Sequence, residues 1–281
     1  MSSNRTTAFH PFIGVIGFGA FGRLMAQHLS KHFRVYAYDP VPPQGGSAEM
    51  CGAMLTDLST AAKCPVVIIA TPVDRLEGTI EAIIPHLRRG ALVLDVGSVK
   101  KIPAEIMRRN LPEQVEIVAT HPLFGPQSAR NGIRGLKIAV CPIRGRRGRR
   151  VAAFLRKVLG LRVIMTTPDA HDREAAMAQA LMHLIAKALI EMEPLPTRMT
   201  TRSFDLLMEA VDMVRYDAPE VVQAIEGSNP YVGKARRRFV QLVSSQARTF
   251  SAPNEESMQF GSGVVNSNAN EIEPQASTRD A

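Results

Sequence analysis

The sequence predicts an α/β fold in which a mainly parallel, doubly wound sheet is followed by an all-helical domain. Between residues 12 and 167, short apolar runs alternate with amphipathic helical patterns, as in sheets covered by helices on both faces. From residue 168 onward the strand signals stop and only helical patterns follow. We therefore expect an N-terminal tail at 1–11, a sheet domain at 12–167, a helical domain at 168–250 and a disordered tail at 251–281.

The individual elements follow from these patterns. Apolar runs predict the strands of the sheet domain at 12–16, 34–38, 64–70, 91–96, 115–119, 137–140 and 161–165. Helices between strands are expected at about 75–87 and 102–109, among others. The helical domain is predicted to contain helices at about 169–193, 202–215, 218–226 and 230–249. These helices are too few for a deep core, so we expect them to pair with a second copy in a homodimer.

Length and composition are those of an ordinary globular protein. The chain has 281 residues, 45% of them hydrophobic and 21% charged, which suits one large or two medium domains. No apolar run approaches the roughly 20 residues that cross a bilayer, and the N-terminal ten residues are too short and polar for a secretory signal. Three cysteines without metal-ligand spacing favour buried thiols in a reducing compartment. We expect a cytoplasmic protein with no metal site and no membrane partner.

The net charge of +8 arises from 34 Lys and Arg against 26 Asp and Glu. Five arginines lie between residues 144 and 150, and such a cluster suggests either nucleic-acid binding or a solvated loop and helix start. The chain has no Trp and only four Tyr, so it lacks the aromatic platforms on which bases stack. We therefore expect a solvated segment and no nucleic-acid partner.

A glycine-rich turn provides the first functional motif. Gly17-x-Gly19-x-x-Gly22 follows the first predicted strand and opens a helix, and Asp39 ends the next strand 22 residues after Gly17. Gly17 permits the tight turn, Gly19 lets backbone amides approach a pyrophosphate, and Gly22 allows close packing of helix on strand. This context predicts a Rossmann-type dinucleotide site, against the alternative of a glycine-rich turn without a ligand.

The cofactor preference depends mainly on Asp39. Its carboxylate would bind the adenosine ribose hydroxyls and repel a 2′-phosphate, which favours NAD. NADP remains possible if Arg34 or a basic residue of the following loop binds that phosphate. The expected cofactor-binding residues are Gly17, Phe18, Gly19, Ala20, Phe21, Gly22, Asp39, Thr71, Pro72 and Val73.

Ser98 and His121 are the candidate chemical groups. Each follows a predicted strand, and ligands of open parallel sheets collect at the carboxyl ends of the strands. A histidine can take a hydroxyl proton as hydride leaves the same carbon, and a neighbouring hydroxyl can position either group. A single histidine at a strand end can also be structural, but the adjacent cofactor motif favours catalysis.

Three blocks of sequence resemble the prephenate/arogenate dehydrogenase family. They are Leu94-Asp-Val-Gly-Ser-Val-Lys100, Ala119-Thr-His-Pro-Leu-Phe-Gly-Pro-Gln-Ser128, and Ala170-His-Asp-Arg173 with His183. The resemblance covers residues 12–250 and implies oxidative decarboxylation of a cyclohexadienyl ring with hydride transfer to the cofactor, in tyrosine biosynthesis. It implies that His121 accepts the proton of the ring 4-hydroxyl and that Ser98 binds this hydroxyl or His121.

The resemblance also implies substrate-binding residues. Gln127 belongs to the middle block, and His183 matches a position near the substrate, although a helix-packing histidine is the alternative. His171 and Asp172 are interpreted as a cap and an interdomain contact rather than as chemical groups.

Asp212 stands where prephenate-using members commonly have an arginine, and this resembles the plant-like arogenate branch. A carboxylate there would pair with the ammonium group of arogenate, which prephenate lacks. Asp212 could instead be an exposed helix residue near Arg215. We therefore expect oxidation of L-arogenate to L-tyrosine, with prephenate dehydrogenase activity as the alternative.

Two other functional hypotheses remain, and both are more distant. A β-hydroxyacid dehydrogenase would use a catalytic lysine on the long helix, for which Lys187 is available, but it leaves the His121 block unexplained. An NAD-sensing interaction protein would not need Ser98 and His121 at the strand ends.

Overall fold

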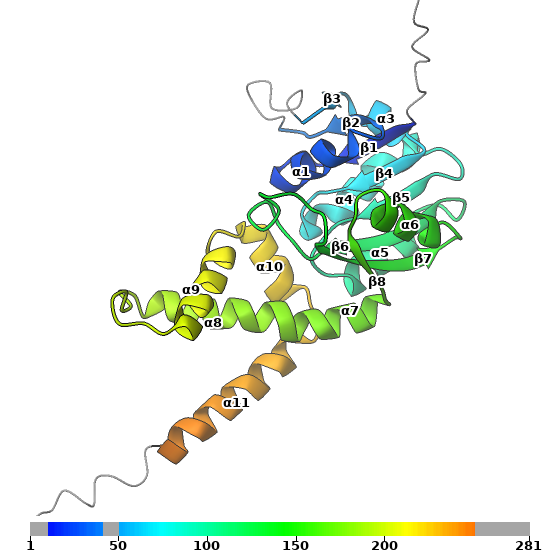
Figure 1. Cartoon of the computed structure of the whole chain (residues 1–281). Helices are drawn as coiled ribbons and strands as arrows, with labels where there is room; N and C mark the ends of the chain where they lie inside the picture. Colours follow the sequence, from blue (N-terminus) through cyan, green and yellow to red (C-terminus); the bar gives the residue numbers. More distant parts are fainter. Residues whose placement is uncertain (1–10, 42–50, 251–281) are drawn as a thin grey trace, which may run out of the picture. The chain divides into compact units, whose positions relative to one another are not determined.

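The computed structural model describes residues 11–41 and 51–250 (Figure 1). The predicted disordered tail at 251–281 and all but the last residue of the predicted N-terminal tail lie outside the described residues. The chain divides into two compact units, one ending at Phe239 and the other beginning at Val240. This boundary falls within helix α11 (Val232–Phe250). The sheet and the helices up to α10 thus belong to one unit.

The described residues form a single eight-stranded sheet of order β3-β2-β1-β4-β5-β6-β7-β8. All neighbouring strands are parallel except β6 and β7, which are antiparallel. This confirms the predicted doubly wound, mainly parallel sheet. The strands are β1 (Phe12–Ile16), β2 (Arg34–Tyr38), β3 (Ala53–Leu55), β4 (Val66–Ile69), β5 (Leu92–Asp95), β6 (Glu116–Pro122), β7 (Lys137–Arg144) and β8 (Arg162–Met165).

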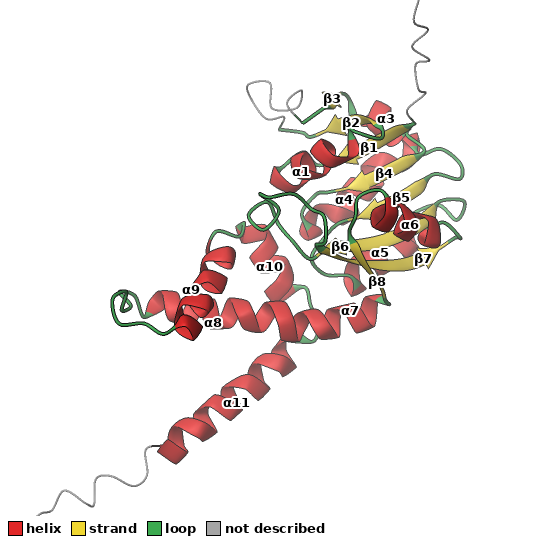
Figure 2. Ribbon diagram, in the orientation of Figure 1, coloured by secondary structure: helices red, strands yellow, loops and turns green. Residues whose placement is uncertain are grey.

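Helices cover both faces of the sheet (Figure 2). Side chains of α1 (Ala20–Leu29) and α6 (Gly148–Lys157) join one hydrophobic core, and those of α3 (Leu58–Ala62), α4 (Leu76–Ile83) and α5 (Lys101–Asn110) join the other. Successive strand residues alternate between the two cores, since Val67 and Ile69 face one and Ile68 the other. This double burial explains the continuous apolar runs of the sequence.

Several elements differ from the prediction. Strand β3 and helix α3 were not predicted, because three and five residues are too short for a clear periodicity. Strand β6 runs to Pro122 rather than 119, and β7 runs to Arg144 rather than 140, because the two pair in an antiparallel ladder that extends both. His121 therefore lies inside β6, opposite Ala139, and does not follow the strand.

The helical region begins at Pro168, where Thr167 caps α7 (Pro168–Ala175) by accepting a hydrogen bond from the Ala170 amide. The long helix predicted at 169–193 contains a π turn (Ala176–Ala180), continues as α8 and ends at residue 191. The remaining bounds are α8 (Leu181–Glu191), α9 (Arg202–Arg215) and α10 (Pro219–Gly227). The buried cluster of this region consists of Ala176, Ala180, Ile225, Val232 and Ala235. These mostly small side chains make a thin core, as the sequence predicts.

The arginine cluster has partly structural roles. The Arg144 guanidinium donates hydrogen bonds to the carbonyls of Leu111, Pro112 and Val115 at the end of α5. Arg147 pairs with Glu116 at 2.8 Å. These two arginines are therefore held against the protein and only partly exposed, unlike the fully solvated segment expected. No helix among the described residues is long and apolar enough to span a membrane. The cysteines are unpaired thiols, two buried and one half-buried.

Candidate active site

The glycine turn has the backbone geometry that its motif predicts. Gly17 has a φ of +97°, which favours glycine, and a Cβ there would lie 2.7 Å from the backbone of Ala70. A Cβ on Gly22 would lie 2.3 Å from the carbonyl oxygen of Gly17. Both glycines are therefore required for the close approach of β1, α1 and β4 at this edge of the sheet.

Gly19 leaves the amino end of α1 open. A Cβ on Gly19 would meet no atom within 4 Å, and none of the described side chains caps the helix. The first turn of α1 also contains no acidic residue. Unpaired amides at the positive end of a helix dipole bind phosphate. These residues therefore fit a dinucleotide whose pyrophosphate is held by the loop and the first turn of α1.

Asp39 stands next to this loop at the end of β2. Its Oδ2 accepts a hydrogen bond from the Phe18 amide at 2.6 Å, and its Oδ1 accepts one from the Val41 amide at 2.9 Å. Each carboxylate oxygen retains a second lone pair that can accept a ribose hydroxyl. Arg34 lies at the opposite end of the strand, with its guanidinium 5.8 Å from the Phe12 ring centroid. The suggested binding of a 2′-phosphate by Arg34 is therefore not supported.

The other expected cofactor-binding residues differ in whether their side chains are buried or exposed. The Phe18 side chain is buried in the core, so only its backbone belongs to the loop. Ala20 is exposed, and the half-buried Phe21 packs near Phe124, with ring centroids 6.2 Å apart. Thr71, Pro72 and Val73 follow β4 at the same edge of the sheet as the glycine loop.

His121 is the central ionisable group of the neighbouring strands. Its side chain is buried, and its Nδ1 lies 2.8 Å from Nε2 of His171. Burial, together with the nearby His171 and Lys100, holds the pKa of His121 well below its ordinary value of 6.5. At neutral pH the imidazole is therefore uncharged and able to accept a proton.

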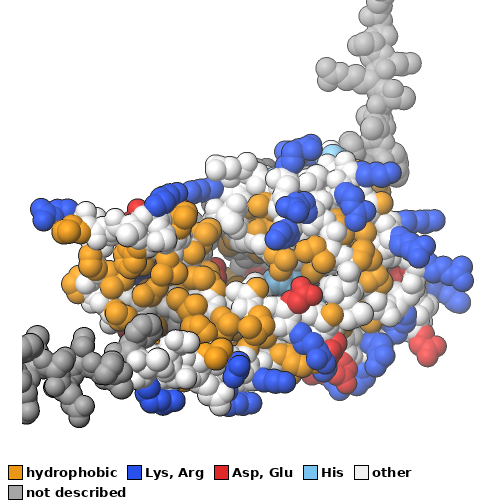
Figure 3. All heavy atoms as spheres, turned by 60° about the horizontal axis from the view of Figure 1, so that its bottom comes forward, with side chains coloured by type: hydrophobic (Ala, Val, Ile, Leu, Met, Phe, Trp, Pro, Cys, Tyr) orange, Lys and Arg blue, Asp and Glu red, His pale blue; other side chains and the backbone are white. Residues whose placement is uncertain are grey.

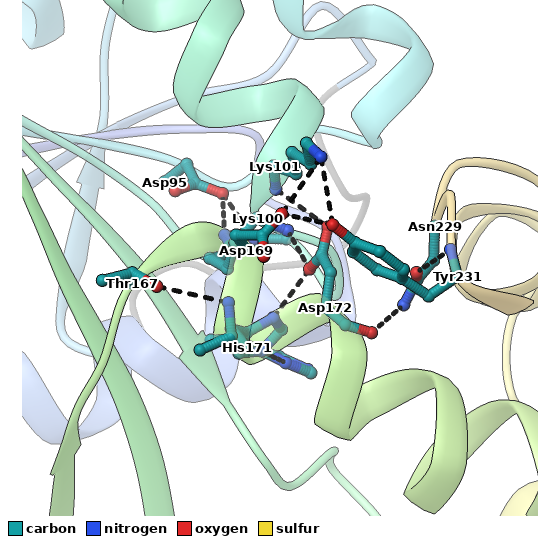
Figure 4. Close-up of polar contacts among 12 residues, drawn as sticks. Asp95, Lys100, Lys101, Thr167, Asp169, His171, Asp172, Asn229 and Tyr231 are labelled. Carbon is teal, nitrogen blue, oxygen red and sulfur yellow. Dashed lines mark hydrogen bonds and ion pairs between the residues drawn. The ribbon is translucent and has the colours of Figure 1, made fainter.

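Asp172 connects His171 to the sheet domain (Figure 4). Its Oδ1 lies 2.8 Å from Nδ1 of His171 and accepts the Lys100 amide at 2.7 Å, while its Oδ2 accepts the Lys101 amide at 2.9 Å. These two amides stand at the amino end of α5, where a carboxylate is favoured by the helix dipole. Asp172 therefore caps α5 and joins the start of α7 to it.

A buried ion pair lies beside His121. The Lys100 ammonium, which has no exposed surface, donates to Oδ2 of Asp95, and the Gly97 amide donates to the same oxygen at 3.1 Å. Burial raises the pKa of Asp95 above 3.8, and the Lys100 ammonium opposes this shift. The Thr120 hydroxyl donates to the Asp95 carbonyl at 2.6 Å, which ties β6 to the end of β5.

A second polar cluster joins α5 to the helical region. Asp169 accepts hydrogen bonds from Lys101 at 3.0 Å, from Arg173 at 2.8 Å and from the Tyr231 hydroxyl. Lys101 and Arg173 also lie over the Tyr231 ring, at 5.2 and 4.8 Å from its centroid. The Asn229 amide donates to the Asp172 carbonyl at 2.8 Å. These contacts hold the start of α7 against α5.

The remaining predicted site residues are not gathered around His121 by hydrogen bonds. Ser98 is half-buried in the loop after β5, and no hydrogen bond joins it to His121 within the described part of the chain. Gln127 is exposed. His183 is buried on α8 with its Nε2 3.3 Å from Asp217, as a helix-packing histidine would be. The Asp212 side chain is 64% exposed and pairs with Arg215 at 3.1 Å. Their roles in substrate binding remain predictions.

Sequence reasoning missed that His171 contacts His121. The adjacent His171-Asp172 pair at the start of a helix was visible, but the two histidines are 50 positions apart, and only the packing of α7 against the sheet reveals their contact. The buried Asp95–Lys100 pair was also not predicted. No cluster of potential metal ligands occurs among the described residues.

A hollow opens on the face of the molecule shown in Figure 3. Hydrophobic side chains gather around it, and histidine and acidic side chains are visible within it. Such a combination of apolar walls and a few polar groups is typical of small-molecule sites.

Comparisons with known proteins show which proteins the chain resembles. A family model described as prephenate dehydrogenase, nucleotide-binding domain, matches residues 23–159, from within α1 to just past α6. The chain is 27% identical over 237 residues to arogenate dehydrogenase 1, chloroplastic, of Arabidopsis thaliana; the match covers 81% of this chain and 37% of that protein. It is 26% identical over 239 residues to a probable arogenate/prephenate dehydrogenase of Methanocaldococcus jannaschii, covering 80% and 53%. The chain is thus similar to the prephenate/arogenate dehydrogenase family.

The chain spans 37%, 53% and 64% of the length of three curated relatives that it matches. Its fold resembles that of prephenate dehydrogenase from Aquifex aeolicus in complex with hydroxyphenyl propionate and NAD+, with a TM-score of 0.67, 19% identity and coverage of 86% and 91%. It also resembles Synechocystis arogenate dehydrogenase, with a TM-score of 0.63, 22% identity and coverage of 85% and 92%. These likenesses confirm the fold, a Rossmann-type sheet followed by helices.

The depressed pKa of His121 predicts how stability depends on pH. The unfolded chain binds a proton at this residue near pH 6.5, but the folded protein does not, so acidification favours unfolding. A single such group lowers the free energy of unfolding by up to about 1.4 kcal/mol per pH unit below its unfolded pKa. Denaturant unfolding of the wild type and His121→Asn between about pH 7 and 5 measures this effect. The variant should lose less stability, whereas equal losses would show that His121 is not held neutral.

Proposed function

We propose that the chain catalyses the oxidative decarboxylation of L-arogenate to L-tyrosine, with hydride transfer to NAD(P)+. The observation that carries this proposal is the buried, neutral His121 on β6, at the same edge of the sheet as the open glycine loop. These features occur in a chain whose residues 23–159 match the nucleotide-binding domain of prephenate dehydrogenase. β1 and β6 are three strand positions apart, about 14 Å, so one extended dinucleotide can reach from the loop toward His121.

His121 acts on the 4-hydroxyl of the cyclohexadienyl ring. The oxidised nicotinamide ring, when bound, supplies the acceptor for the hydride that leaves C4. His121 takes the hydroxyl proton as the C4–H bond breaks, and a C4 carbonyl forms. The C1–carboxylate bond then breaks, and its electron pair enters the ring to give CO2 and a phenolate. His121 returns the proton to the phenolate oxygen, so the reaction releases no net proton. Ser98 is proposed to bind the same oxygen.

Arogenate is the preferred substrate in this proposal because two Arabidopsis relatives are named arogenate dehydrogenases. Asp212 is proposed to bind the ammonium group that distinguishes arogenate from prephenate, with His183 and Gln127 near the rest of the substrate. Arg215 already pairs with Asp212 and also with Glu193, which weakens any such selectivity. This pairing favours prephenate as the second candidate substrate, oxidised by the same mechanism to 4-hydroxyphenylpyruvate.

The alternative function, that of a β-hydroxyacid dehydrogenase, has less support than the proposed one. Its candidate catalytic residue, Lys187, pairs with Glu226 at 2.7 Å and is half exposed.

NAD is the proposed cofactor in preference to NADP. The carboxylate of Asp39 lies beside the glycine loop, where it would repel a 2′-phosphate. Residues 40–50, which follow it, contain no lysine or arginine to bind such a phosphate. Both observations favour NAD over NADP.

A homodimer formed through the helical region is also proposed. Large apolar side chains are exposed just after α8 and on α9 and α10, and the buried core of this region is thin. Exposed apolar surface that is left by a thin core is commonly buried against a second copy. The exposed residues include Met192, Leu206, Leu207, Met213 and Val221. Light scattering should give about twice the 30.7 kDa chain mass, and a monomer at micromolar concentration would contradict the proposal.

The proposed activity is tested by NADH formation with purified protein and either arogenate or prephenate. We expect turnover with arogenate to exceed that with prephenate. His121→Asn should reduce kcat by about 10²–10⁴-fold and leave nucleotide affinity unchanged, because the imidazole is the proton acceptor. Full turnover of this variant would remove the mechanism. Preference for prephenate would keep the reaction and discard Asp212 as the selector, and inactivity with both substrates would overturn the proposed function.

Asp39→Asn tests the cofactor preference, because it removes the charge with little change of shape. We expect the ratio of NAD to NADP specificity, measured as kcat/KM for each, to fall by about tenfold or more. Glu81→Gln, an exposed carboxylate on α4, is the control for net charge and should leave the ratio unchanged. An unchanged ratio in Asp39→Asn would exclude Asp39 as the determinant.

A further inference from the structure

His171 lies between His121 and Asp172, and the proposed reaction assigns no role to it. Its Nε2 lies 2.8 Å from Nδ1 of His121, and its Nδ1 lies 2.8 Å from Oδ1 of Asp172. All three side chains are buried. They form an unbroken chain of hydrogen bonds from the carboxylate on α7 to the imidazole on β6, and Figure 4 shows the His171–Asp172 part of it.

The carboxylate decides where the protons lie along this chain. An ionised carboxylate only accepts hydrogen bonds, so His171 carries a proton on Nδ1. A neutral His171 then has a lone pair on Nε2, and His121 donates to it from Nδ1. His121 is left with an unprotonated Nε2, which is the form that a general base needs.

The position of Asp172 is itself fixed by contacts with two other segments of the chain. Its two oxygens accept the amides of Lys100 and Lys101, and its carbonyl accepts the side-chain amide of Asn229. The amino end of α5 stabilises the ionised form of the carboxylate through its dipole. Asp172 is therefore a rigid, charged acceptor for His171.

We propose that His171 and Asp172 are positioning residues, which hold His121 in its Nδ1-protonated tautomer and share the positive charge that it acquires with the substrate proton. The kinetic consequence of this inference rests on the proposed function. The tautomers, however, exist in the protein without any substrate, and they can be observed separately.

The proton movements balance along the chain. The O–H bond of the substrate hydroxyl breaks, and an N–H bond forms at Nε2 of His121. The Nδ1 proton of His121 shifts toward Nε2 of His171, whose own Nδ1–H faces Asp172. The positive charge thus lies next to a buried carboxylate, and the shifts reverse when the phenolate takes the proton back.

The other ionisable groups around the two histidines do not supply this compensating charge. Lys100 and Asp95 neutralise one another in their ion pair. Burial raises the pKa of the Cys141 thiol on β7 to about 12, so it stays neutral. Among the described neighbours, the carboxylate of Asp172 is therefore the group that offsets an imidazolium at His121 or His171.

Three variants separate tautomer control from charge sharing. Asp172→Asn replaces an acceptor by an amide that can also donate, which favours the opposite tautomer of both histidines. His171→Gln keeps an acceptor for His121 but cannot take a proton, and His171→Leu removes both functions. Asp169→Asn is the matched control: it weakens the neighbouring contact of α7 with α5 but touches neither histidine.

Long-range ¹H–¹⁵N correlation spectra of the free wild-type protein report the imidazole tautomers. We expect His121 and His171 both to be neutral and protonated on Nδ1. In Asp172→Asn both should shift toward protonation on Nε2, whereas Asp169→Asn should show the wild-type tautomers. A wild-type His121 protonated on Nε2, or a doubly protonated His171, would overturn the inference whatever the activity.

Steady-state kinetics test the consequence for turnover. We expect kcat to fall by about 10²–10⁴-fold in Asp172→Asn and in His171→Leu, by less in His171→Gln, and with little change in KM. Removal of the carboxylate also disfavours the protonated pair, so the acid limb of the kcat profile should shift to lower pH in Asp172→Asn. A loss of kcat with an unmoved acid limb would indicate a structural role only. If no substrate is turned over, the spectra still decide the inference, while the proposed function fails.

Discussion

The carboxylate of Asp172 is the contact on which the rest of the site depends. It accepts the Lys100 and Lys101 amides at the start of α5 and the ring nitrogen of His171 at the start of α7. One buried charge thus joins the sheet domain to the helical region and places His171 against His121. A buried carboxylate is costly unless it is fully hydrogen-bonded, and here it has three donors from two elements. Its loss would disturb the helix cap and the position of His171 against His121 together.

The nucleotide part of the site could be predicted from the sequence because its geometry is local. Gly17, Gly19 and Gly22 occur within six residues, and each glycine requirement follows from a contact between neighbouring segments. The bounds of β1 and β2 also match their apolar runs. By contrast, β3 and α3 are too short for a periodicity, and the extension of β6 depends on its partner β7, which no local pattern specifies.

The chemical part of the site could be predicted only in part. His121 was identified from its position near a strand end, but its partner His171 lies 50 positions later in the chain and required the packing of α7 on the sheet. Asp212 shows the opposite case, in which a residue chosen by resemblance lies exposed and paired with Arg215. An exposed charged side chain on a helix can form an ion pair with one of several neighbours, and the sequence does not show which pair forms. The histidine chain is the proposed base, and the residues proposed to select the substrate are likewise predictions.

Hydrogen exchange at the Lys100 and Lys101 amides tests the central contact most directly. Among the described residues, Asp172 is the acceptor of both amides, so their exchange in the wild-type protein should be slow, like that of the core amides of β5. In Asp172→Ala both amides should exchange much faster while β5 remains protected. Rapid exchange of Lys100 and Lys101 in the wild type, at the rate of exposed loop amides, would contradict the account.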